Sequence, residues 1–232
     1  LLLIQRPGVD RTAEFTVNPD FGQVEVDPAV VNLSAFETFF PEQRPFFLEG
    51  ADAFAFGQVP IHNDYSGQEF FYSRRIGRAP QRSPYGSGVA FADAPTETTI
   101  VGAGKVSGRA GPWTIGLLDA VTPEEHAGIA LADGTRGTTP VEPATNYFAG
   151  RLKRDFRQGA SSIGVMGTWT ARKVGDPLFN SLLRNNAYFA GVDFQHSWRQ
   201  RTWVVSGFLA GSRVTGSASV MAATQQNSTH YY

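Results

Sequence analysis

Long runs of β-type sequence fill the chain from about residue 98 onward. Each run holds ten to fourteen residues, rich in β-branched and aromatic side chains and bounded by turn-forming residues. Strands of this length are typical of membrane-spanning sheets, which need about 9–11 residues, whereas strands of soluble proteins average about 5–6. The runs predict six strands, over Thr98–Arg109, Trp113–Thr122, Thr145–Phe156, Ser161–Arg172, Asn186–Trp198 and Thr202–Thr215.

Two of these runs alternate between polar and apolar residues. Residues 145–156 carry polar or small side chains at every second position from Tyr147, and residues 186–198 carry Asp193 and Gln195 on one side. Because successive side chains of a strand point to opposite faces, each run has one polar and one mostly apolar face. In a barrel the polar side chains would face the lumen, although solvation of any water-facing wall would give the same pattern. The lumen-facing candidates are Arg151, Lys153, Asp155, Asp193 and Gln195.

The connections between the runs alternate in length. Tight turns are predicted at 110–112, 157–160 and 199–201, and longer loops at 123–144 and 173–185. In a meander every second connection lies at the same edge of the sheet, so one edge carries the turns and the other the loops. Outer-membrane barrels have this asymmetry, with short periplasmic turns and longer external loops.

Aromatic residues lie near both ends of the predicted strands. Two such girdles are expected of a transmembrane barrel, because amphipathic rings favour the headgroup level on each side of the bilayer. The alternative is a soluble β-sandwich whose aromatic side chains fill its core. One girdle would comprise Trp113, Phe156, Trp198 and Trp203, and the other Tyr147, Phe148, Tyr188 and Phe189.

The first 97 residues differ from the rest because proline recurs there and limits long helices and central strands. Short strands are predicted at Glu14–Asn18, Gln23–Asp27 and Phe70–Ile76, with a short helix over Ala35–Phe40 capped by Ser34. The predicted fold is all-β: an antiparallel meander forming part of a transmembrane barrel, preceded by this irregular segment. Residues 1–97 form the irregular segment, a candidate plug or barrel entry, and residues 98–232 form the barrel strands.

The composition limits which binding and catalytic functions the chain is expected to have. Twenty basic and twenty-one acidic side chains leave a formal charge of −1, which gives no electrostatic support to nucleic-acid binding. The chain has no cysteine, and its four histidines have no metal-ligand spacing. No G-x-S-x-G nucleophile motif occurs either. We therefore predict no cofactor and no metal site built on histidine or cysteine.

Acidic residues of the irregular segment are the only concentrated reactive groups. They are expected to form structural pairs with nearby arginines through bidentate contacts. Two alternatives remain: calcium binding through carboxylate oxygens, and glycoside hydrolysis by acids near Glu42 and Glu49. No catalytic residue is assigned, and an enzyme is the less favoured interpretation. The cluster comprises Asp20, Glu25, Asp27, Glu37, Glu42, Arg44, Glu49, Arg74, Arg75 and Arg78.

Four blocks of the sequence resemble the domain-of-unknown-function family 5916. They are residues 16–28, 31–50, 71–78 and 146–156, which together span most of the chain. The resemblance implies a bacterial protein that carries a secretion signal and a family 9-like carbohydrate-binding module before an outer-membrane barrel domain. No activity or catalytic residue is implied. Since the sequence starts at Leu1 rather than Met, we expect it to be a piece of a longer chain.

These observations predict a fragment of an outer-membrane β-barrel protein of a Gram-negative bacterium, with a role in carbohydrate-related binding or uptake. Its expected partners are outer-membrane lipid and carbohydrate held by an upstream module. Two alternatives remain. One is a secreted or periplasmic glycan-acting hydrolase, and the other is a non-transporting outer-membrane anchor or scaffold.

Overall fold

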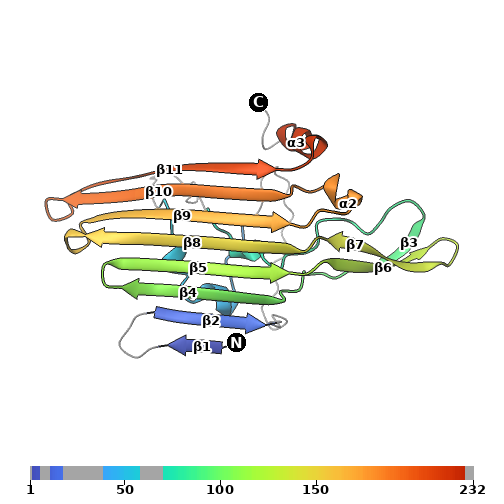
Figure 1. The fold of residues 1–232 in the computed structure, drawn as a ribbon, viewed down its shortest axis with the longest axis horizontal. Coiled ribbons are helices and arrows are strands. Elements are labelled where there is room, and N and C mark those ends of the chain that lie inside the picture. Colours follow the sequence, from blue (N-terminus) through green and yellow to red (C-terminus); the bar gives the residue numbers. More distant parts are fainter. Residues whose placement is uncertain (1, 6–10, 18–38, 58–69, 228–232) are drawn as a thin grey trace.

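An eight-stranded antiparallel sheet dominates the protein (Figure 1). The computed structural model describes residues 2–5, 11–17, 39–57 and 70–227. Within them the strand order is β1-β2-β4-β5-β8-β9-β10-β11, and β1 and β11 form the two open edges. The predicted antiparallel meander is therefore confirmed. The strands are β1 (Leu2–Gln5), β2 (Arg11–Val17), β4 (Gly102–Ala110), β5 (Trp113–Thr122), β8 (Thr145–Phe156), β9 (Ser161–Arg172), β10 (Asn186–Trp198) and β11 (Trp203–Thr215).

The six predicted long strands are present, four of them with the predicted bounds. The strand predicted at Thr98–Arg109 begins later, at Gly102, because the backbone before it binds elsewhere. The Thr98 amide donates to the carbonyls of Gly77 and Arg78, and the Thr98 hydroxyl donates to Arg78 as well. The strand predicted at Glu14–Asn18 overlaps β2, which begins earlier, at Arg11, and pairs with β4; Asn18 lies outside the described residues.

The long loop predicted at 123–144 contains a hairpin, so that prediction was wrong. Strands β6 (Glu125–Leu131) and β7 (Arg136–Glu142) pair with each other, and β3 (Val89–Asp93) joins β6 to complete a three-stranded sheet. This sheet continues beyond the loop ends of β5 and β8 (Figure 1). The turn is closed by the Asp133 carboxylate, which accepts from the Thr135 amide at 2.8 Å, and by Gly134 at φ 88°.

Described residues 39–57 and 70–78, here called the inner segment, pack against one face of the large sheet, behind it in Figure 1. They contain α1 (Pro45–Leu48) and the 3₁₀ turns η1 (Ala51–Phe54) and η2 (Ser73–Arg75). The core between segment and sheet comprises Phe46, Phe47, Ala53, Phe54, Ile76, Ile100, Ala103, Leu118, Ala120, Tyr147 and Ala149. The segment is thus held to the sheet by a continuous apolar contact.

The strand predicted at Phe70–Ile76 was wrong, because an arginine occupies backbone acceptors that a strand would need. Arg44 donates to the carbonyls of Ser73 and Ile76, and the chain between them turns as η2. Of the predicted helix over 35–40, only Phe39 and Phe40 are described, and they are not helical. The rest of it, and the strand predicted at Gln23–Asp27, lie outside the described residues.

Three further elements lie at the strand connections. The turn between β8 and β9 contains η3 (Arg157–Gly159), and the loop between β9 and β10 contains α2 (Pro177–Asn180), capped by the Asp176 carboxylate. A helix, α3 (Ala218–Gln225), follows β11 and is capped by Ser217. In the described part of the chain, no helix has the length and apolar character needed to cross a membrane.

Candidate functional site

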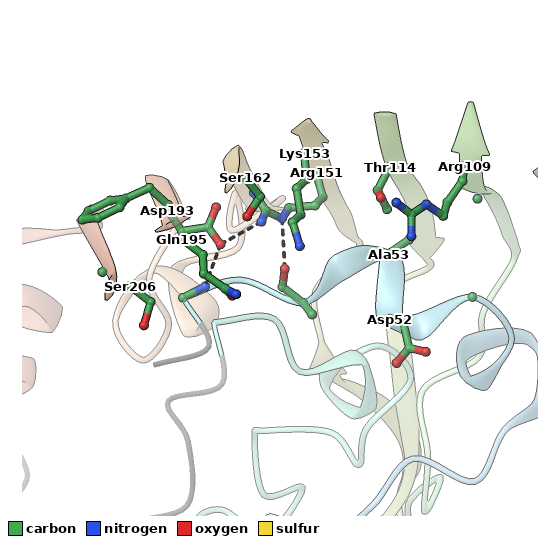
Figure 2. A pocket seen from close by; sticks show the side chains of 16 residues that line it. Asp52, Ala53, Arg109, Thr114, Arg151, Lys153, Ser162, Asp193, Gln195 and Ser206 are labelled. Carbon is green, nitrogen blue, oxygen red and sulfur yellow. Dashed lines mark hydrogen bonds and ion pairs between the residues drawn. The ribbon is translucent and has the colours of Figure 1, made fainter. Parts of the chain in front are cut away.

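The predicted lumen-facing residues all lie on the face of the sheet that the inner segment covers. The strand register aligns Lys153 with Gly164 and Asp193, and aligns Asp155 with Ser162 and Gln195. Four of the five candidates line a cavity of about 560 Å³ between the sheet and the inner segment, and Figure 2 shows it from close by. The cavity lies at the strand ends that carry the short turns. These four are Arg151, Lys153, Asp193 and Gln195.

Arg151 and Asp193 form the centre of this site. Arg151 Nη2 lies 2.8 Å from Asp193 Oδ2, and the arginine side chain is 1% exposed. Both residues also bind the backbone of the inner segment: Arg151 Nε donates to the Ala55 carbonyl at 3.0 Å, and the Gly57 amide donates to Asp193 Oδ2 at 3.1 Å. The ion pair is therefore also an attachment point for the inner segment (Figure 2).

A glycine in the intervening strand makes room for the arginine. A Cβ atom at Gly164 on β9 would lie 2.1 Å from Arg151 Nη1, so the guanidinium occupies the space above this residue. Arg151 Nη1 and Asp193 Oδ1 are buried and have no hydrogen-bond partner among the described residues. Buried polar atoms without a partner are costly, and these two remain able to bind a polar group that enters the cavity.

The rest of the cavity wall offers hydrogen-bonding groups of both kinds. Arg109 pairs with Asp155, and Lys153 Nζ lies 3.9 Å from the same carboxylate. Asp155 itself does not line the cavity. Hydroxyl, amide and carboxylate side chains complete the polar wall: Asp52, Thr114, Ser162, Gln195 and Ser206. This arrangement suits a small hydrophilic molecule with several donors and acceptors.

A second buried cation, which sequence reasoning missed, also binds the inner segment. Lys105 on β4 lies 3.0 Å from Glu14 Oε1, and both side chains are fully or almost fully buried. Its ammonium group donates to the Phe46 carbonyl and, at 2.5 Å, to the Glu49 carbonyl. Lys105 thus holds the two ends of α1 against the sheet. The available signal was a lysine within a strand of small residues, 102–108, with Glu14 at a polar position of another strand.

The acidic and basic cluster is only partly described. Asp20, Glu25, Asp27 and Glu37 lie outside the described residues. Glu42 and Arg44 form the bidentate pair expected of the structural interpretation, with Nε–Oε1 and Nη2–Oε2 distances of 2.8 and 2.7 Å. The side chain of Ser73 also donates to Glu42, at 2.5 Å.

The environment of Glu42 favours its ionised form. Burial raises the pKa of the Glu42 carboxyl, but hydrogen bonds from Arg44 and Ser73 and the charge of Arg44 outweigh it and lower the pKa below 4.5. A general acid of a glycosidase needs a raised pKa instead. Glu49 is exposed and contributes its backbone carbonyl to Lys105.

The remaining arginines of the cluster belong to the second part of the inner segment, residues 70–78. Arg74 donates to the Pro41 carbonyl at 2.8 Å and lies over the Phe40 ring. Arg75 and Arg78 line a separate cavity near the loop ends of the strands. Among the residues the structure describes, no three histidine, aspartate or glutamate side chains gather as metal ligands would.

Comparison with protein families matches the sequence to a family profile. This profile, described as a domain of unknown function (DUF5916), covers residues 11–230. The chain belongs to this family. The match includes the inner segment, both attachment points and every strand from β2 to β11, so it spans the whole candidate site. No curated protein and no solved structure matches the chain.

Proposed function

We propose that the large sheet is part of the wall of a transmembrane β-barrel in the outer membrane of a Gram-negative bacterium, with the inner segment in the lumen as a plug. The observation that carries this proposal is the distribution of side chains between the two faces. The covered face holds the buried charges, whereas large apolar side chains are exposed on the other face, here called the open face. A lipid-facing wall requires such an apolar surface.

The middle of the open face is aliphatic. The strand register aligns one row across four strands, from β8 to β11, and its four members are between 39% and 81% exposed. An exposed apolar surface of this extent is unusual in a protein surrounded by water. The row consists of Leu152, Val165, Val192 and Leu209.

Aromatic residues lie on both sides of this aliphatic region. Trp169 and Tyr188 stack at a centroid distance of 6.0 Å on the loop side, and Trp198 and Trp203 stack at 6.5 Å beside a short turn. Tyr188 and Trp198 are ten positions apart on β10, which spans ~26 Å at a rise of ~3.4 Å and a tilt of ~40°. The apolar band of a transmembrane barrel is about 25 Å tall.

The aromatic positions differ in part from the predicted girdles. Phe148 and Tyr188 lie on the open face, as a girdle requires, but Tyr147 is buried in the core and Phe189 packs against Phe56 and Phe70 on the covered face. Trp169, which was not predicted, belongs with the first pair. The stacked aromatic pairs on the open face are therefore Trp169 with Tyr188 at the loop side and Trp198 with Trp203 beside the turn.

The role we propose is binding and passage of a small hydrophilic solute of the carbohydrate class. The polar cavity around Arg151 and Asp193 supports this role, because sugars need several donors and acceptors at fixed positions. The attachments that hold the inner segment in place would make passage depend on its movement. The described contacts of Glu42 do not favour the hydrolase alternative, since its oxygens are taken by Arg44 and Ser73.

The wall proposal can be tested by site-directed spin labelling, for which the absence of native cysteine is an advantage. Val165→Cys labels the open face and Gln195→Cys the covered face, in protein reconstituted into lipid vesicles. We expect the label at 165 to collide with molecular oxygen and to be protected from a water-soluble nickel complex, and the label at 195 to show the reverse. Access of the nickel complex to position 165 in the reconstituted protein would overturn the proposal.

Liposome swelling tests whether the protein lets small sugars pass through the membrane. Vesicles containing the full-length protein should swell in isotonic arabinose and more slowly in a trisaccharide. Removal of the Arg151 attachment should increase the rate. An absence of swelling with every sugar, for both proteins, would favour the anchor or scaffold alternative.

A further inference from the structure

A second cavity lies between the inner segment and the sheet, near the loop ends of β8 to β11. Its volume is about 270 Å³, and aromatic side chains from the inner segment and from the strands line it. Three arginines also line it, Arg75, Arg78 and Arg172, and no carboxylate does within the described part of the chain. In the described part of the chain, its wall therefore combines guanidinium groups with aromatic rings.

Two of these arginines have buried nitrogen atoms without a hydrogen-bond partner. Nε of Arg78 and Nε of Arg172 are both in this state among the described residues. Arg172 makes one long contact, from Nη1 to the Arg184 carbonyl at 3.3 Å. Two guanidinium groups that share a partly buried site repel each other unless an anion lies between or beside them.

Glu142, the carboxylate that acts electrostatically on Arg172, does not lie between the two arginines in the cavity. The two carboxylate oxygens of Glu142 instead accept from the Gln81 backbone amide at 2.8 Å and from the Gln81 side-chain Nε2 at 2.7 Å. Glu142 is also absent from the cavity wall. Among the described residues, the Nε donors of Arg78 and Arg172 thus remain available to a ligand.

We propose that this cavity binds a small carboxylate carried on a single ring. A guanidinium group binds a carboxylate through two parallel hydrogen bonds, which explains arginine rather than lysine at both positions. The aromatic walls would pack against the face of the ring. At about 270 Å³ the cavity is at the small end of ligand pockets, which limits the ligand to one ring.

The site is separate from the cavity around Arg151. Phe56, Phe70, Phe189 and Phe208 form a cluster with centroid distances of 5.0 to 5.9 Å between inner segment and sheet. Phe70 and Phe189 line the second cavity, whereas none of the four lines the first. Ligand binding here depends on the packing of the inner segment and is independent of closure of the sheet into a barrel.

Isothermal titration of the full-length protein tests the proposal with four probes. D-glucuronate and D-glucose form one charged and neutral pair, and benzoate and benzyl alcohol form the other. We expect a carboxylate to bind at least tenfold more tightly than its neutral partner. Preference for glucuronate would identify a sugar acid, and preference for benzoate an aromatic acid. No binding by any probe, or equal binding within both pairs, would overturn the proposal.

Substitutions locate the binding. Arg172→Gln and Arg78→Gln should each weaken carboxylate binding at least tenfold, while Arg136→Gln, at an exposed position of β7, should leave it unchanged. Because the two arginines belong to different parts of the fold, a folding defect in one variant leaves the other as the test. Wild-type affinity in both folded variants would contradict the assignment.

Discussion

Arg151 on β8 and Asp193 on β10 pair across the intervening strand, at 2.8 Å, and together bind the inner segment at Ala55 and Gly57. A pair that reaches over a whole strand needs a long side chain at one end and an empty position in between. Arg151 provides the first and Gly164 the second. Three distant parts of the sequence thus depend on one contact, which makes it the first place to test attachment of the inner segment.

Arg151→Met should destabilise the protein by about 3 kcal/mol, because it leaves the Asp193 carboxylate largely buried without its cation. It should also expose residues 39–57 to limited proteolysis, since the Ala55 carbonyl loses its donor. The matched control is Lys153→Met, on the same strand face but 39% exposed, which should cost about 0–1 kcal/mol. Equal urea midpoints for the two variants would contradict the role given to Arg151.

Gly191 tests how closely the inner segment approaches the sheet. A Cβ atom there would lie 2.5 Å from Phe56 Cζ and 2.9 Å from the Ala210 Cβ. Gly191→Ala should therefore displace Phe56 and cost about 1–3 kcal/mol. Gly211→Ala, on the neighbouring strand with no atom within 4 Å, should stay within about 0.5 kcal/mol of wild type. Thermal unfolding of both variants measures the difference, and similar losses would show that Phe56 is not the cause.

Lys105→Met should cost about 3–5 kcal/mol, because Glu14 then remains buried without a cation. A double variant, Lys105→Met with Glu14→Leu, removes the uncompensated charge and should recover part of this loss. It should not restore α1, because the carbonyls of Phe46 and of Glu49, the residue that follows the helix, still lack their donor. Hydrogen exchange over residues 45–54 measures that second effect separately from urea unfolding. Full recovery of protection in the double variant would contradict the attachment role of Lys105.

The regular part of the fold was predictable because the long strands are runs of ten to fourteen residues bounded by turn-forming residues, and two of them also alternate clearly. The alternation put Arg151 and Asp193 on polar strand faces, and the structure places both side chains on one face of the sheet. Lys105 was not placed in this way, since glycine and alanine on β4 hide its pattern. The attachments of the inner segment were also not predictable, because they use backbone carbonyls and a backbone amide, which leave no trace in the order of side chains. The hairpin of β6 and β7 does have a sequence signal, Asp133 followed by Gly134, a pair typical of tight hairpin turns.

Glu42 should make the stability of the inner segment pH-dependent. Its folded pKa lies below the ordinary 4.5, owing to hydrogen bonds from Arg44 and Ser73 that outweigh burial. The carboxylate therefore stabilises the folded state fully above about pH 4.5, and this contribution is lost as pH falls through the lowered pKa. Subtracting the stability of Glu42→Gln from that of wild type, by urea unfolding at several pH values, should give a difference that shrinks on acidification. A difference that is constant with pH would contradict the lowered pKa.

Val165 lies in the aliphatic row of the open face, between Leu152 and Val192, and is the sharpest test of what covers that face. A charged residue at the bilayer midplane of a barrel costs about 2–4 kcal/mol. Val165→Arg should therefore reduce the heat-modifiable form of the full-length protein in isolated outer membranes. Gln195→Arg adds the same charge to the covered face, beside the polar cavity, and should be tolerated. If water covers the open face instead, arginine at 165 is tolerated as well, and the difference between the two variants disappears.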